Sequence, residues 1–171
     1  MKRSSDFSLG KLYKALDAQR KERGLSWSEA TRQMNRRSDD HAHQLSSSTV
    51  MNLRTGRIAE ADGILQALLW LNRTPESFVS GYRSVKAENA KLPEVALNRV
   101  LRFDTEKLYV TLNTKRVKKN VYWTQLAEEI GLSESILKHL SKGGRTAFPP
   151  VMRILRWLKE PASSFVREAK W

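Results

Sequence analysis

Residues 123–140 read Trp-Thr-Gln-Leu-Ala-Glu-Glu-Ile-Gly-Leu-Ser-Glu-Ser-Ile-Leu-Lys-His-Leu, and they form the most informative segment of the chain. Apolar residues recur at helical spacing on both sides of Gly131, which predicts one helix over Trp123–Ile130 and another that ends near Leu140. Gly131 lies where a sharp turn needs a positive φ, and Ser133 can cap the second helix. The segment therefore predicts two crossed helices whose apolar frame is Leu126, Ile130, Leu132, Leu137 and Leu140.

Comparison of the chain with itself shows that it is a duplication. Equivalent positions are 96 residues apart in the early part of each copy and 87 residues apart in the later part. The clearest pairs are Leu12-Tyr13 with Leu108-Tyr109, Trp27 with Trp123, Trp70-Leu71 with Trp157-Leu158, and Ser77-Phe78-Val79 with Ser164-Phe165-Val166. The offsets differ by nine (96 − 87), so the first copy has nine extra residues within 35–44, where the second has only Gly131.

Helical spacing and capping residues predict five short helices in each copy. The expected elements are a first helix from Gly10 to about Arg23, a second capped by Ser26 or Ser28, a third over Ser46–Thr55 capped by Ser46 or Ser47, a fourth over Val151–Lys159 opened by Pro149-Pro150, and a last short helix that starts near Ala162-Ser163 and buries Phe165.

The sequence predicts no β-sheet, either within the copies or in the segment between them. No part of the chain alternates between apolar and polar residues over a useful length, so no sheet is expected anywhere. Residues 80–102 begin polar and become apolar at their end, which predicts a flexible segment followed by a bridging helix. The expected fold class is all-α, with a first five-helix domain over residues 8–84, a partly helical linker over 85–103 and a second five-helix domain over 104–171.

The composition indicates a polyanionic partner. The 171 residues include 31 Lys and Arg against 18 Asp and Glu, which gives a net charge of +13. Both halves are basic, with 14 against 9 in residues 1–84 and 17 against 9 in residues 85–171. Such a balance favours nucleic acid as a partner. Cysteine is absent, no apolar run reaches the ~18 residues of a membrane span, and no secretory signal is present, so a cytoplasmic protein is expected.

The third helix of each copy is predicted to expose small and polar residues. These residues are Ser47, Ser48, Met51 and Asn52 in the first copy and Glu134, Ser135, Lys138 and His139 in the second. A short helix of this kind, with basic residues near its end, suits the major groove of DNA. The basic residues expected to contact phosphates are Arg54, Arg57, Lys142, Arg145, Lys118 and Lys119.

This pattern resembles the helix-turn-helix of the lambda-repressor-like (Cro/repressor, XRE) family, and the resemblance covers each whole copy. Residues 70–78 and Trp157–Phe165 look like the junction between the fourth and fifth helices in that family. The third helix is the recognition helix there, so the resemblance implies that the eight residues named above read DNA bases.

The first copy departs from the family pattern. Asn35 replaces the turn glycine, Thr31 replaces the small alanine, and the turn is expanded over residues 35–44. The docking angle of this copy is therefore left open. Arg36, Arg37, His41 and His43 could touch phosphates, and His41 and His43 with Asp39 and Asp40 are a weak metal candidate because their spacing in a loop supplies no ligand geometry.

The sequence as a whole predicts a sequence-specific regulator that binds double-stranded DNA, expected to act as a repressor on an asymmetric site. The alternative is a protein-binding module, such as an antitoxin or inhibitor with the same fold, and self-association also stays open. RNA binding is disfavoured because the A-form major groove excludes a helix. Trp27, Trp70, Trp123 and Trp157 are expected to pack in the core. No enzyme chemistry, cofactor, metal, membrane or small-molecule ligand is predicted.

Overall fold

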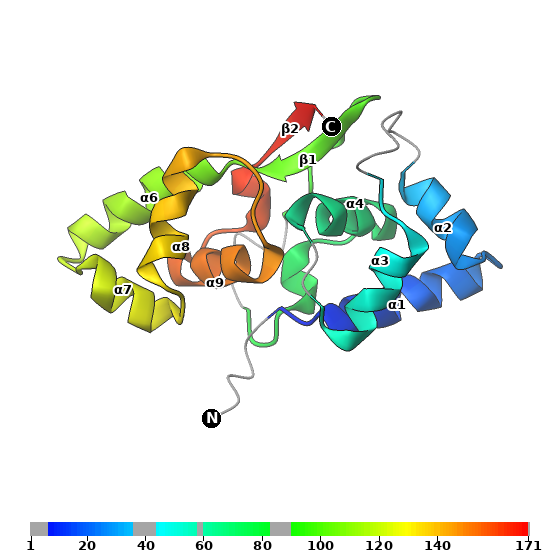
Figure 1. The fold of residues 1–171 in the computed structure, drawn as a ribbon, viewed down its shortest axis with the longest axis horizontal. Helices are drawn as coiled ribbons and strands as arrows, with labels where there is room; N and C mark the ends of the chain where they lie inside the picture. Colours follow the sequence, from blue (N-terminus) through cyan, green and yellow to red (C-terminus); the bar gives the residue numbers. More distant parts are fainter. Residues whose placement is uncertain (1–6, 36–43, 58–59, 83–89, 171) are drawn as a thin grey trace.

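The computed structural model describes residues 7–35, 44–57, 60–82 and 90–170, which are mostly helical and include one small two-stranded sheet (Figure 1). The predicted residues in the expanded turn, Arg36, Arg37, Asp39, Asp40, His41 and His43, lie outside these ranges. No helix in the described ranges is long and apolar enough to cross a membrane.

The first repeat forms the helices that its sequence predicts. They are α1 (Leu9–Glu22), α2 (Trp27–Met34), α3 (Ser47–Asn52) continued by the 3-10 turn η2 (Leu53–Thr55), α4 (Ala61–Leu71) and the 3-10 turn η3 (Pro75–Phe78). Ser26 caps α2 in a capping box with Glu29, and Ser46 caps α3 by accepting from the Thr49 amide. These hydrogen bonds from Ser26 hold the pKa of the Glu29 carboxyl below its usual value.

The second repeat follows the same order. Its elements are α6 (Thr105–Lys118), α7 (Trp123–Ile130), α8 (Glu134–His139), the 3-10 turn η4 (Leu140–Lys142), α9 (Phe148–Leu158) and the 3-10 turn η5 (Ala162–Phe165). The predicted helix over Trp123–Ile130, the Ser133 cap and the burial of Phe165 are confirmed. Ser8 and Asp104, which are equivalent, cap α1 and α6 in the same way.

The expectation that the chain needs no sheet was wrong. Strand β1 (Arg99–Phe103) pairs antiparallel with β2 (Val166–Lys170), and Phe103 lies opposite Val166. Residues 90–103 therefore contain a strand in place of the bridging helix predicted for the 85–103 linker. The burial of both Val100 and Leu101 explains the missed strand, because burial on both faces removes the alternation that marks a strand in sequence.

The same pairing occurs in reduced form in the first repeat. Phe7 and Val79, the equivalents of Phe103 and Val166, form an isolated antiparallel bridge. The amide of Ser8 donates to the Phe78 carbonyl at 2.9 Å, and the amide of Asp104 donates to the Phe165 carbonyl at 2.7 Å. In both repeats the entry to the first helix is therefore tied to the end of the last 3-10 turn.

The two repeats are arranged about a pseudo-two-fold axis. Glu60 and Ala147 occupy equivalent positions (147 − 60 = 87) and pair with each other in an antiparallel bridge. A two-fold axis brings a position opposite its own equivalent, which defines an isologous interface. In Figure 1 this axis runs along the line of sight, so that α1 lies diagonally across from α6, α2 from α7 and α4 from α9.

One hydrophobic core continues through both repeats. The ring of Phe148, at the start of α9, is fully buried. Its centroid lies 4.5 Å from that of Phe7 in the first repeat and 5.6 Å from that of Phe103 in the second. Because Phe7 and Phe103 are themselves equivalent, Phe148 packs against the same feature of both copies.

Polar contacts also join the repeats. The Glu76 carboxylate accepts from the Ala162 amide at 2.6 Å, and the Ala61 amide donates to the Thr146 carbonyl at 3.1 Å. The Tyr82 hydroxyl donates to the Glu160 carbonyl, and burial raises the pKa of this phenol well above its usual value. Tyr82 consequently stays neutral and keeps its proton for this contact between the repeats.

Replacement of Phe148 by alanine is expected to lower the free energy of unfolding by about 3–5 kcal/mol, because the deleted ring leaves a cavity between the repeats. Chemical denaturation monitored by circular dichroism measures this change. Leu97→Ala is the control, since this side chain is 77% exposed and its loss should cost about 0.5 kcal/mol or less. Equal effects of the two substitutions would contradict a shared core centred on Phe148.

Candidate nucleic-acid interface

Helices α3 and α8 are held by the same two anchors. Val50 and Leu53 are buried beneath α3 and η2, and their equivalents Leu137 and Leu140 are buried beneath α8 and η4. This burial turns the opposite face of each helix outward. The residues that the sequence predicted for that face are exposed, or half-buried in the case of Ser47 and Glu134: Ser47, Ser48, Met51, Asn52, Glu134, Ser135, Lys138 and His139.

An arginine in each repeat fixes the helix that precedes α3 or α8. The Arg20 guanidinium donates to the Leu25 carbonyl at 2.8 Å and lies 4.8 Å from the centre of the Trp27 ring system. Its equivalent Arg116 donates to the Val121 carbonyl at 3.0 Å and lies 4.5 Å from the Trp123 ring. These arginines therefore set the angle between the first and second helices of each repeat.

The tryptophans pack against the core, as predicted, although each stays half-buried. Trp27 stacks on Tyr13, and Trp123 stacks on Tyr109, with both pairs of ring centroids 5.5 Å apart. The indole N–H of Trp157 donates to Glu129 at 2.7 Å, and that of Trp70 donates to Gln33 at 3.1 Å. These contacts use the ring faces and N–H groups to brace the helices.

The turn between the second and third helices differs between the repeats. Gly131 ends α7 with φ of 74°, a conformation that favours glycine, and leads within two residues to the Ser133 cap. Asn35 ends α2 with φ of −86° and leads into the nine extra residues. The sequence difference at this position therefore changes the path of the backbone.

The Asn35 side chain closes the expanded turn at its base. Its amide group donates to the Leu45 carbonyl at 2.7 Å, and its oxygen accepts from the Leu45 amide at 2.9 Å. Gln66 of α4 donates to the same oxygen at 3.2 Å and to the Met34 carbonyl at 3.0 Å. This network joins the end of α2 to the residue just before the α3 cap, so α3 stays packed against α2 despite the insertion.

The two exposed helix faces carry different charges. On α8, the Lys138 ammonium pairs with the Glu134 carboxylate at 2.8 Å. Helix α3 contains no charged residue, and its exposed side chains include those of Ser48, Met51 and Asn52. The duplication has kept the helix positions while changing what they present.

Five of the six residues predicted to contact phosphates are exposed after the third helix of a repeat or at the end of α6. Arg54, Arg57 and Lys142 are exposed just after α3 and α8, and Lys118 is exposed at the end of α6. The Lys119 ammonium lies 5.0 Å from the Trp157 ring, as the equivalent Arg23 guanidinium lies 4.9 Å from Trp70. These lysines and arginines keep their charges at the surface beside the third helices or at the end of the first.

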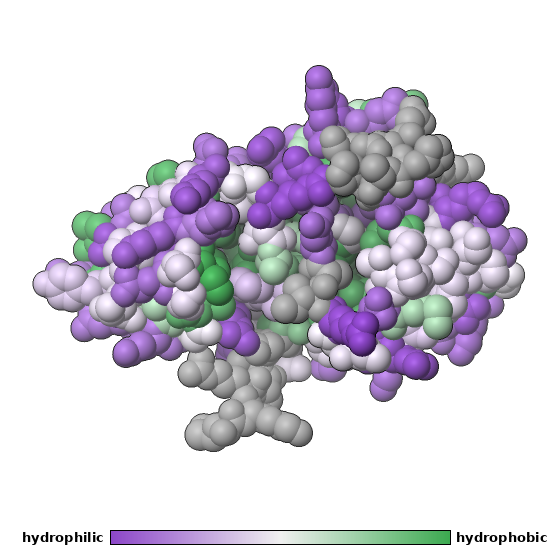
Figure 2. Space-filling view, in the orientation of Figure 1, coloured by the Kyte–Doolittle hydropathy of each residue, from purple (hydrophilic) through white to green (hydrophobic). Residues whose placement is uncertain are grey.

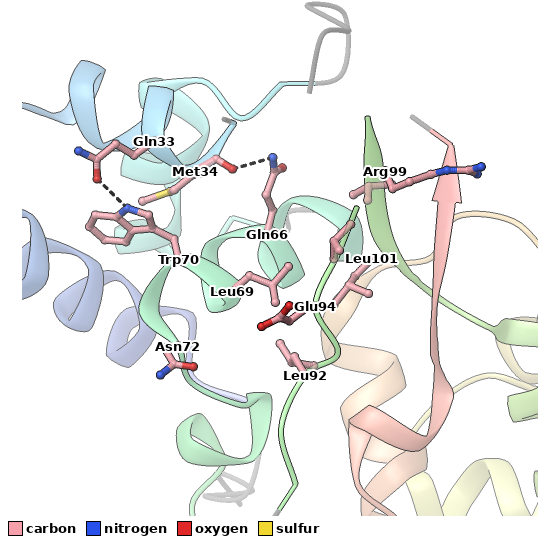
Figure 3. Close-up of a pocket in the computed structure, with 12 residues that line it drawn as sticks. Gln33, Met34, Gln66, Leu69, Trp70, Asn72, Leu92, Glu94, Arg99 and Leu101 are labelled. Carbon is pink, nitrogen blue, oxygen red and sulfur yellow. Dashed lines mark hydrogen bonds between the residues drawn. The ribbon is translucent and has the colours of Figure 1, made fainter. Parts of the chain in front are cut away.

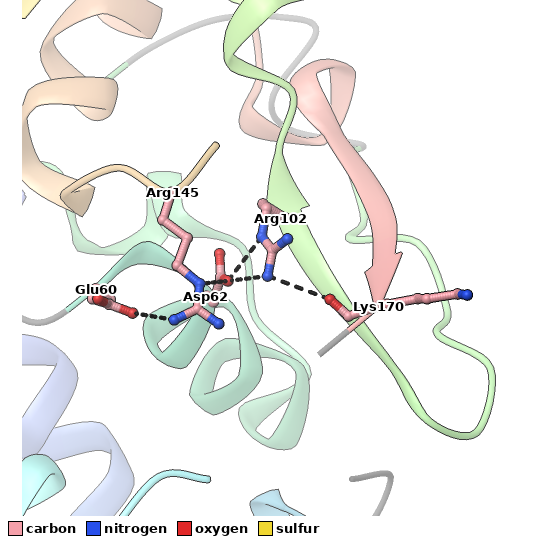
Figure 4. Close-up of polar contacts among 5 residues, drawn as sticks. All are labelled: Glu60, Asp62, Arg102, Arg145 and Lys170. Carbon is pink, nitrogen blue, oxygen red and sulfur yellow. Dashed lines mark hydrogen bonds and ion pairs between the residues drawn. The ribbon is translucent and has the colours of Figure 1, made fainter. Parts of the chain in front are cut away.

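Arg145 lies instead at the junction of the repeats. Figure 4 shows its guanidinium beside the acidic residues at the start of α4, 3.4 Å from Glu60 and 3.6 Å from Asp62. Asp62 is nearly buried and also accepts from Arg102 of β1 at 2.9 Å. The arginine that the sequence assigned to phosphate thus has carboxylate partners of its own, and their loss would be part of the cost of moving it to DNA.

The surface over the third helices is hydrophilic or intermediate in hydropathy (Figure 2). Figure 2 shows this face in the orientation of Figure 1, with polar side chains spread across both halves and only small hydrophobic areas between them. A surface of this kind suits contact with a charged, hydrated partner.

A separate pocket of about 350 Å³ lies between the first repeat and the segment that leads into β1. Figure 3 shows Trp70 and Gln66 on one side and Leu92 and Leu101 on the other, with Gln33 bound to the Trp70 indole. The pocket forms because residues 92–101 cross the outer face of α4. No local pattern in the sequence indicates this pocket, because it depends on where residues 92–101 lie.

Comparison with protein-family models, with curated proteins and with solved structures found no match to this chain. The duplicated helices, their exposed faces and the basic charge are therefore the observations from which a function is inferred.

Asn35→Ala is expected to reduce the free energy of unfolding by about 1–3 kcal/mol, because it leaves partly buried backbone groups of Leu45 without their partners. Denaturant titration measures the loss. The matched control is Asn52→Ala, which removes an exposed amide and should change stability by about 0.5 kcal/mol or less. If both variants unfold at the same denaturant concentration, Asn35 does not hold the base of the turn.

Proposed function

We propose that this protein binds double-stranded DNA in a sequence-specific manner and regulates transcription, as a repressor, with α3 and α8 as its two recognition helices. The observation that carries the proposal is the paired arrangement of these helices. Each is a short, capped helix whose apolar side is buried and whose polar side is exposed, and each follows a braced second helix. A helix presented in this way fits the major groove.

The pseudo-two-fold axis supports simultaneous use of both helices. Duplex DNA has local two-fold symmetry, and proteins with two recognition helices commonly place them in successive major grooves on one side of the duplex. Figure 1 shows α3 and α8 on either side of the α4–α9 centre, viewed along the pseudo-axis. One chain would thus supply what two identical subunits supply in a symmetric dimer. In this proposal each repeat is a helix-turn-helix domain similar to the lambda-repressor-like family.

The basic charge supports DNA over a neutral partner. The net charge of +13 is distributed over both repeats, and Arg54, Arg57 and Lys142 are exposed beside the two helices. An electrophoretic shift with labelled duplex, challenged by excess tRNA or by excess unlabelled duplex, tests the proposal. Duplex alone should displace the label efficiently. If tRNA displaces the labelled duplex equally well, the result would favour RNA binding. If the protein forms no complex with the labelled duplex or with tRNA, the result would favour a protein partner.

Binding is expected to weaken steeply with salt, because phosphate contacts release counterions. If ~6–10 phosphates are neutralised, affinity should fall ~10³–10⁵-fold between 50 and 200 mM salt. Lys142→Ala should reduce the slope of log affinity against log salt by about one. Fluorescence anisotropy measures both quantities, with Lys91→Ala as a control that removes the same charge from outside the repeats. An identical slope for all three proteins would remove Lys142 from the contacts.

The distance between the two half-sites is expected to be fixed, because a continuous core holds the recognition helices. An insertion of about 5 bp, half a helical turn, between the half-sites of a selected site would move one of them to the other side of the duplex. Binding should then fall toward the affinity for a single half-site. Insertion of about 10 bp tests the span directly. Unchanged affinity with the 5-bp insertion would show that the two recognition helices move independently of each other.

A further inference from the structure

The exposed faces of α3 and α8 differ at two pairs of equivalent positions. Met51 is equivalent to Lys138, and Asn52 is equivalent to His139 (139 − 52 = 87). All four side chains are exposed, on helices whose buried anchors are also equivalent. The duplication therefore provides two supports of the same shape with different chemistry on their surfaces.

The face of α3 matches A·T base pairs. The Asn52 amide carries one donor and one acceptor group, which can pair with N7 and N6 of adenine in the major groove. Met51 is 45% exposed despite being apolar, and an apolar side chain at this place can contact the thymine methyl group. Helix α3 has no charged side chain that would favour the two acceptors of guanine.

The face of α8 matches G·C base pairs. The Lys138 ammonium has only donors, and guanine presents two adjacent acceptors, O6 and N7, in the major groove. Its ion pair with Glu134 holds Lys138 along the exposed side of the helix, at 2.8 Å. The Glu134 carboxylate itself can accept from the N4 amino group of cytosine. His139 adds a further donor beside Lys138.

Ile136 and its equivalent Thr49 lie at one edge of these faces, next to His139 and Asn52 three residues further along each helix. Both fall on the flank opposite Lys138 and Met51, given 3.6 residues per turn. Ile136 is 39% exposed there. The apolar surface of α8 is therefore separated from the side that carries Lys138 and Glu134.

We propose that α3 and α8 read base pairs of opposite composition. Helix α3 recognises a half-site that contains A·T pairs, through Met51 and Asn52. Helix α8 recognises a half-site that contains G·C pairs, through Glu134, Lys138 and His139. This inference rests on the proposed function. The pseudo-two-fold axis would impose a palindromic site if the two exposed faces were identical. The faces differ at Met51 and Asn52 against Lys138 and His139, and this difference breaks the symmetry. The DNA site then has two different halves. Each repeat binds its own half, and this fixes the orientation of the protein on the DNA.

Selection of duplexes from a random pool tests this inference. Wild-type protein should enrich a site with A·T pairs in one half and G·C pairs in the other. The double variant Met51→Lys/Asn52→His, which gives α3 the residues of α8 at these two positions, should shift the A·T half-site toward G·C. The reciprocal variant Lys138→Met/His139→Asn should shift the other half-site to A·T. Binding to the original site should fall roughly 5- to 150-fold for each base pair that is misread.

Two controls keep the outcomes separate. Lys91→Ala removes a charge from outside both helices and should leave the selected sequence unchanged, and circular dichroism checks that each variant is folded. Enrichment of the same composition in both halves, or a selected site that neither exchange alters, would overturn the inference while leaving duplex binding intact. Failure of wild-type protein to enrich any duplex would overturn the proposed function as well.

Discussion

The packing of Phe148 between Phe7 and Phe103 is the contact on which the rest of the structure depends. The two outer rings occupy equivalent positions in the two repeats, and Phe148 packs against both of them near the pseudo-two-fold axis. The position equivalent to Phe148 is Ala61, which is also buried. Two identical subunits would have to place the same side chain at both positions. A duplicated chain can place a large residue at one and a small residue at the other, and so fill the interface without overpacking it.

This shared core determines how the exposed helices can act. Because Glu60 pairs with Ala147 and Arg145 pairs with Glu60 and Asp62, the helices α4 and α9 cannot separate without breaking backbone and charged contacts. Helices α3 and α8 are anchored in the same core through Val50 and Leu137. The angle and distance between the two helices are therefore properties of the fold, and β1 contributes to them through the pairing of Arg102 with Asp62 of α4.

The two repeats keep the same framework with different local solutions. Gly131 makes the turn of the second repeat through its own backbone conformation, whereas Asn35 makes the corresponding junction with its side chain. Arg20 and Arg116 keep identical roles, since each bonds a carbonyl and covers a tryptophan. The two repeats thus differ in sequence where another group can make the same hydrogen bonds. They also differ on the exposed faces of α3 and α8, which are proposed to bind DNA.

The sequence by itself determined the duplication, the helices and the faces they expose, because these depend on residue spacing and on capping within about one turn. It placed Ser47, Asn52, Lys138 and His139 at positions that the structure leaves accessible. Arg145 was assigned by its place after the third helix, but its partners come from a segment more than 80 residues away. The β1–β2 sheet and the pseudo-two-fold axis were likewise decided by tertiary structure. Both bring together segments of different repeats or opposite ends of one repeat. Neither strand alternates in the sequence, because Val100 and Leu101 of β1 are both buried and Arg167 and Glu168 of β2 are both exposed.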